Sequence, residues 1–138
     1  MLHSILAPVP VLIAWTLVMW LWMYVTRIPA MRKAGISAAR MREKSEMDVL
    51  PREVRQVADN HNHLHEQPVL FYALAFYVHL SGAEDAVMIA LAWTYVGLRV
   101  VHSLYQARVN FIPGRFLLYA LATILLIVMS VRSLIALV

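Results

Sequence analysis

The stretch from Glu53 to Pro68, EVRQVADNHNHLHEQP, is polar and runs directly into the apolar segment VLFYALAFYVHL. Four of its side chains recur at a spacing of three or four residues: Arg55, Asp59, Asn62 and Glu66. At 100° per residue these positions share one face of a helix. Ionisable groups at membrane depth are costly unless they face a bundle interior or a wet cavity, so we interpret this face as a binding site. A purely structural network between helices is the alternative.

A second polar cluster interrupts a later apolar run, where Arg99, His102 and Gln106 share one helical face. An arginine inside a membrane needs an acidic or carbonyl partner, and Glu66 or Asp59 would supply an acid from a neighbouring helix. A turn signalled by NFIPG then places Arg115 at the mouth of the last apolar run. By itself Arg115 could be a simple interface anchor.

Three alternating histidines, His61, His63 and His65, raise the question of a metal site. His61 and His65 have the i, i+4 spacing of helical metal ligands. However, the HExxH order is absent, and alternating residues point to different sides of a helix. We therefore expect no bound metal and interpret the histidines as hydrogen-bonding or interfacial groups.

The composition indicates an integral membrane protein. Of the 138 residues, 62% are hydrophobic and 14% are charged, whereas soluble domains have roughly 25% charged residues. The chain has no cysteine, so a nucleophilic thiol would have to come from a ligand. The net charge of +4 does not indicate nucleic acid, because the basic residues lie between apolar runs, where membrane topology explains them.

The apolar runs predict one all-α domain, 1–138, folded as a transmembrane four-helix bundle in up-down-up-down order. Each run is long enough to cross a bilayer, which takes about 20 helical residues. The expected spans are 5–26, 52–80, 86–107 and 115–137. Eight of the twelve Lys and Arg residues lie in 27–55, so we expect this loop in the cytoplasm and both termini on the opposite side.

The order of these motifs resembles the MAPEG family, the membrane-associated proteins in eicosanoid and glutathione metabolism, in its bacterial type. The resemblance rests on NHLHEQP at 62–68, RVVHSLY at 99–105 and PGR at 113–115. It implies a homotrimer that binds glutathione as co-substrate between neighbouring subunits, near the cytoplasmic face. It also implies membrane lipids and a hydrophobic small molecule as partners, and no nucleic acid.

The resemblance further implies roles for individual residues. Arg115 falls where catalytic members place an arginine that polarises the glutathione thiol. Seven residues match positions that contact glutathione or support its site: Arg32, Arg55, Asn62, Glu66, Arg99, His102 and Tyr105. Because arginine stays protonated, Arg115 would stabilise the thiolate and would not act as the base.

The sequence departs from the family pattern in three places. Tyr105 lies one residue early, with Gln106 at the usual position of the aromatic residue. Ala58 stands where members often carry a further arginine, and His65 stands where they place the acid, with Glu66 one residue later. Three functions therefore remain open. The first is a glutathione-dependent transferase or peroxidase acting on hydrophobic electrophiles or lipid hydroperoxides. The others are a non-catalytic lipid-binding protein and a small transporter or assembly subunit.

Overall fold

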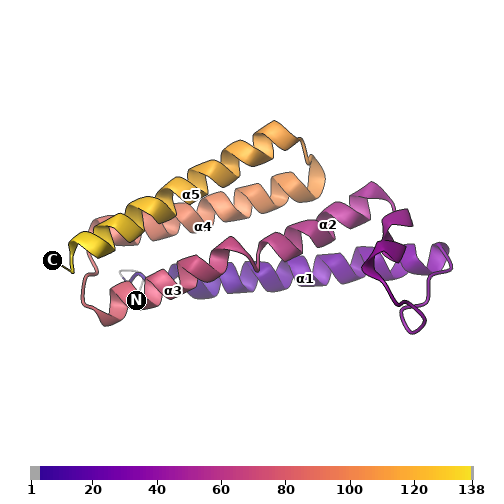
Figure 1. Ribbon diagram of the computed structural model, residues 1–138, viewed down its shortest axis with the longest axis horizontal. Helices are drawn as coiled ribbons and strands as arrows, with labels where there is room; N and C mark the ends of the chain where they lie inside the picture. The colour runs from indigo at the N-terminus through magenta and orange to yellow at the C-terminus, as the bar shows by residue number, and fades with distance from the viewer. Residues whose placement is uncertain (1–3, 138) are drawn as a thin grey trace.

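The computed structural model describes residues 4–137, which form helices, turns and no strand. The helices are α1 (Pro8–Lys33), the short 3-10 helix η1 (Lys44–Val49), α2 (Arg52–His63), α3 (Gln67–Leu80), α4 (Ala86–Arg108) and α5 (Ile112–Ile135). This confirms the all-α prediction. The first described residues and the end of α5 lie at the same end of an elongated molecule (Figure 1).

The helices run back and forth along one long axis. α1 leads away from the N-terminal end, α2 and then α3 return beside it, and α4 and α5 form a second antiparallel pair (Figure 1). α4 packs against α1, α2 and α5, so it is the central helix of the arrangement. Its polar residues are therefore the ones that can face several other helices at once.

Three helices, α1, α4 and α5, are long and apolar enough to cross a membrane. They have 26, 23 and 24 residues, against the roughly 20 that a bilayer requires. α1 continues to Lys33, so the first part of the expected 27–55 loop is helical. Many large apolar side chains on these helices are exposed, such as Val25 at 71% and Phe116 at 68%, which suits a lipid environment.

The expected span 52–80 is not one continuous helix. α2 has 12 residues and α3 has 14, and Glu66 between them has φ −94° and ψ −91°. Pro68 at the start of α3 explains the break, because proline has no N–H for the carbonyl of Leu64 and its ring clashes with that carbonyl. The break leaves carbonyl groups at the end of α2 without helical partners, in the middle of the molecule.

The apolar core joins all the long helices. It includes Leu12 of α1, Phe71 of α3, Tyr95 of α4 and Met129 of α5, each fully buried. The rings of Phe71 and Tyr95 stack with centroids 4.6 Å apart. This packing fixes α3 against α4 one or two turns beyond the break, which holds the end of α2 in place.

Candidate functional site

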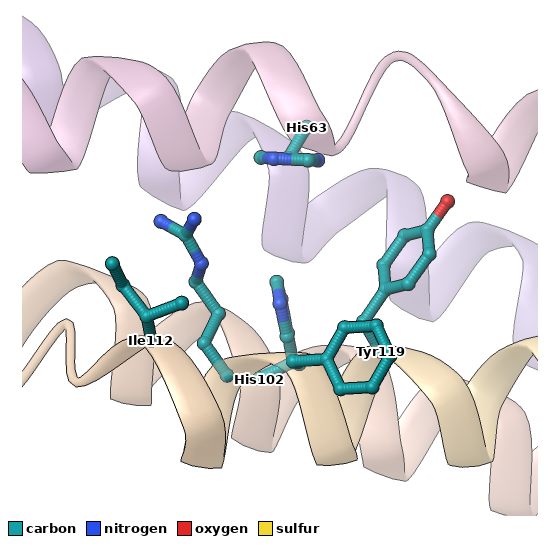
Figure 2. A pocket seen from close by; sticks show the side chains of 6 residues that line it. His63, His102, Ile112 and Tyr119 are labelled. Atoms are coloured by element: carbon teal, nitrogen blue, oxygen red, sulfur yellow. The ribbon is translucent and has the colours of Figure 1, made fainter.

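A cavity of about 200 Å³ lies where the end of α2 faces α4 and the first two turns of α5. It is lined by His63, His102, Ile112, Arg115, Phe116 and Tyr119. Figure 2 shows His63 reaching toward the cavity from α2, across from His102 and Tyr119. None of these six lining residues carries a carboxylate, so the charged residue among them, Arg115, gives the cavity a positive potential.

Three aromatic rings surround the cavity at nearly equal distances. The ring centroids of His63 and His102 are 6.1 Å apart, and each lies 6.2 Å from that of Tyr119. The rings come from three different helices: α2, α4 and α5. A small polar group bound between them would therefore meet two imidazoles and a phenol at once.

Arg115 is positioned by the turn between α4 and α5. Its Nη1 donates a hydrogen bond of 2.9 Å to Oδ1 of Asn110, which adopts the left-handed conformation at φ 51°. Next to Arg115, Gly114 lets the ring of Tyr105 pack against the start of α5, because a Cβ at Gly114 would lie 2.7 Å from the ring carbon Cζ. Tyr105 thus supports the backbone that carries Arg115.

Arg99 is fully buried behind His63 and has a carbonyl as its partner. Its Nη2 donates a hydrogen bond of 2.9 Å to the carbonyl oxygen of His63, the last residue of α2. The guanidinium therefore lies at the negative end of the α2 dipole, at the carbonyls that the helix break exposes. Within residues 4–137 it forms no ion pair with Glu66 or Asp59, and its Nε and Nη1 have no hydrogen-bond partner.

A ladder of uncharged polar groups joins α2 to α4. Gln56 Nε2 donates to the carbonyl oxygen of Ala107 at 2.7 Å, and Asn60 Nδ2 donates to Ser103 Oγ at 2.5 Å. Gln106 is buried beside them and neither of its amide atoms has a partner in the described chain. The interior between these helices is therefore polar, with bonding capacity left for water or a ligand.

The charged stripe on α2 and the loop after it faces outward in this single chain. Arg55 and Asp59 are exposed and line a separate cleft of about 70 Å³ with Arg27, Lys44, Met47 and Asp48. Asn62 and Glu66 are exposed as well, although Oε2 of Glu66 approaches Nδ1 of His63 at 3.0 Å. The structure thus brings Arg99, His102 and Arg115 together and keeps Arg55 apart from them.

The remaining sequence candidates lie outside the cavity lining. Arg32 is exposed in the last turn of α1, and Tyr105 packs beneath the α4–α5 turn. The rings of His61 and His65 pack on each other at 4.6 Å, and Nδ1 of His65 lies 2.9 Å from the carbonyl oxygen of His61. Residues 4–137 contain no group of three or more His, Asp or Glu side chains placed to hold a metal.

Four cavity residues were not among the sequence candidates for this site: the polar residues His63 and Tyr119, and the apolar residues Ile112 and Phe116. The sequence gives no signal that separates His63 from His61 and His65, because only the helix break after α2 turns His63 toward the cavity. Tyr119 lies one turn after Arg115 on α5, which is a signal that helical spacing alone could have given. The residues of α2 that face α4, Gln56 and Asn60, were missed because they are uncharged amides. Each directly follows a residue of the charged stripe.

The comparison with known families gives a match over nearly the whole chain. The model of the MAPEG family matches residues 5–135, which include both polar clusters and the turn before Arg115. Among curated proteins and among solved structures there is no match. Because the family match covers nearly the whole chain, this protein belongs to the MAPEG family, a family of membrane proteins with glutathione-related transferase and peroxidase functions.

Proposed function

We propose that this protein is a membrane-bound, glutathione-dependent transferase or peroxidase that acts on hydrophobic electrophiles or lipid hydroperoxides. The observation that carries the proposal is the cavity in which Arg115 is the charged lining residue and no carboxylate competes for it. A free thiol has a pKa of roughly 8.5, and a guanidinium held beside the sulfur in a site of low dielectric favours the thiolate. Arg115 is the group assigned to that role.

The unpartnered polar atoms around the cavity suit a ligand with carboxylates and amides. Nε and Nη1 of Arg99 and Nδ1 of His102 are buried without a partner in the described chain. A buried donor without a partner costs about 1–3 kcal/mol, so a ligand acceptor would recover that free energy on binding. Arg99 would hold a carboxylate, and His102 would fix the ligand beside Arg115.

The proposal includes a homotrimer of four-span subunits with glutathione between neighbours. The exposed residues Arg32, Arg55 and Asn62 then reach the ligand from an adjacent subunit, whereas Glu66 and the supporting ring of Tyr105 act in the subunit that carries Arg115. In this assembly α2 and α3 together form the second span. The basic loop after α1 faces the cytoplasm, both termini lie outside it, and the hydrophobic substrate enters from the bilayer.

A glutathione titration followed by the ultraviolet band of the thiolate tests the proposal. The purified wild-type protein in detergent should develop the band near neutral pH, and Arg115→Ala should lose most of it. The same variant should lower turnover of an aryl halide by about 10²–10³-fold, the usual effect of removing a group that stabilises a developing anion. Arg132→Ala, at the other end of α5, is the matched control. Full thiolate formation by Arg115→Ala would remove the assigned role.

A second candidate, a lipid-binding protein without catalysis, is favoured by one separate feature. A groove of about 540 Å³ runs between α3 and α5, and apolar side chains such as Leu70, Leu126 and Ile127 dominate its walls. Its size lies within the 300–1,000 Å³ of small-molecule sites. Saturable binding of a fatty acid, with no thiolate band on adding glutathione, would favour this candidate over the enzyme.

A further inference from the structure

Of the three neighbouring histidines, only His63 lines the cavity with Arg115. It is the last residue of α2, and the helix break directly after it gives its ring a position that faces both α4 and α5. About a third of its side chain is exposed, so a bound ligand can reach it. His61 and His65 instead pack on each other, outside the cavity.

The two ring nitrogens of His63 have different surroundings. Nδ1 is buried and lies 3.0 Å from Oε2 of Glu66, at ion-pair distance although without hydrogen-bond geometry. Nε2 has no hydrogen-bond partner within residues 4–137 and is not buried. A carboxylate at Nδ1 favours the tautomer with its proton there, which leaves the lone pair of Nε2 available as an acceptor. Catalytic hydrogen bonds are often poorly aligned before substrate binds.

The other described histidines lack this combination. His102 lines the cavity, but its Nδ1 is buried with no carboxylate beside it. His79 has a carboxylate, since its Nδ1 lies 2.9 Å from Oε2 of Glu84, but it lies at the end of α3, away from the cavity. Only His63 joins an open ring nitrogen, an orienting acid and a place next to Arg115. These are the three parts of an activated nucleophile site: acceptor, orienting group and anion stabiliser.

We propose that His63, oriented by Glu66, is the base that removes the proton from the glutathione thiol. This inference rests on the proposed function and supplies a step that Arg115 cannot perform, because a guanidinium stays protonated. Nε2 of His63 takes the proton and Arg115 stabilises the sulfur anion. With an aryl halide, the new S–C bond replaces the C–halogen bond, the halide leaves with the electron pair, and His63 releases the proton to water.

Charged and titratable groups from three helical segments surround His63. Glu66 follows it directly after α2, Arg99 and His102 come from α4, and Arg115 comes from α5. Tyr119 of α5 also faces the ring.

The test separates the rate of thiolate formation from its amount. On rapid mixing with glutathione near neutral pH, His63→Gln should show thiolate and proton release that are slower by about 10²-fold, within the range for loss of a general base. The final thiolate absorbance should stay near that of the wild type, because Arg115 still stabilises the anion. Arg115→Ala should instead lower the final thiolate absorbance.

The pH profile of turnover gives a second readout. The deficit of His63→Gln should shrink as the pH rises above the thiol pKa of roughly 8.5, where the thiol ionises without help. Glu66→Gln should lower turnover near neutral pH about 10-fold, which is less than the effect of removing the base itself. Its deficit should also shrink as the pH rises. His65→Gln, the same substitution two residues away on the outer side, is the control and should behave like the wild type.

Each remaining outcome contradicts a stated claim. If the wild type forms the thiolate and His63→Gln forms it equally fast, the role of His63 is wrong while the proposed function stands. The same holds if the deficit persists at high pH, or if His102→Gln shows the recovery in place of His63→Gln. If the wild type binds no glutathione in a calorimetric titration, the proposed function fails and this inference fails with it.

Discussion

The two ends of the helices differ in how their charged side chains are paired. One end is formed by the α3–α4 turn, and we call it the turn end. There Glu84 contacts His79 and accepts a hydrogen bond from the backbone N–H of Ile5. Next to it, Asp85 caps α4 through the N–H of Met88 at 2.7 Å and pairs with Arg132 of α5. Every helix end there is therefore connected to another by satisfied groups.

The cavity differs from the turn end in this respect; we call this region the cavity end, because the first turns of α5 line it. Arg99 has one bond to a carbonyl, Arg115 has one bond to an amide, and His102 has no partner in the described chain. Unpartnered buried groups lower stability, so a fold keeps them mainly where something else binds. In the proposed function, the turn end serves stability and the cavity end serves the ligand.

The largest effect on the cavity end should come from Gly114. Gly114→Val should lower the free energy of unfolding by about 3 kcal/mol, the upper part of the range for overpacking, because its side chain would overlap the ring of Tyr105. It should also lower activity, since the start of α5 carries Arg115. Gly97→Ala in α4 is the control, because a Cβ there has no neighbour within 4 Å. Unfolding in detergent measures the stability, and turnover of an aryl halide measures the activity. Equal stability and activity of Gly114→Val and Gly97→Ala would contradict the role of Gly114.

A smaller effect distinguishes the inner face of α2 from its outer face. Asn60→Ala should cost about 1–2 kcal/mol in the free energy of unfolding, because the buried hydroxyl of Ser103 loses its donor. Asn62→Ala, on the exposed face, should change thermal unfolding of the single subunit very little. A larger loss at Asn62 than at Asn60 would show that the outer face carries the structural contacts.

The same contrast shows what the sequence could predict. The apolar runs predicted the three long apolar helices α1, α4 and α5, because length and hydropathy are enough to define a candidate span, although α1 ends at Lys33 and not at the expected residue 26. The break at Pro68 was missed because the apolar pattern continues through it. The inner face of α2 was missed for a different reason: charges draw attention, whereas Gln56 and Asn60 are buried by contacts with α4 that no local pattern records.

The smallest predicted effect concerns pH at the turn end. Contact with His79 is the main cause that lowers the pKa of Glu84, and the hydrogen bond from Met88 is the main cause that lowers the pKa of Asp85. A carboxyl whose pKa is lower when folded stabilises the protein above its unfolded pKa, about 4. That contribution is lost as the pH falls through the folded value.

The melting temperature of the wild type should therefore fall in this acidic range, and a variant with both Glu84→Gln and Asp85→Asn should show a smaller fall. Both acids are substituted because a single remaining carboxylate would keep part of the pH dependence. His79, Asp85 and Arg132 are exposed and Glu84 is partly exposed, so the difference should also shrink at high salt. Identical acid profiles for the wild type and the double variant would show that these contacts contribute nothing measurable.

The most direct test of the account compares one arginine from each end in a calorimetric glutathione titration. Arg99→Met should weaken glutathione binding at least about 10-fold. Its effect on thermal stability should be small, because the lost hydrogen bond to the carbonyl of His63 is offset by removal of two buried donors without partners. Arg132→Met should leave the affinity unchanged. Wild-type affinity in Arg99→Met, or weaker binding in Arg132→Met alone, would contradict the claim that the unpartnered end is the glutathione site.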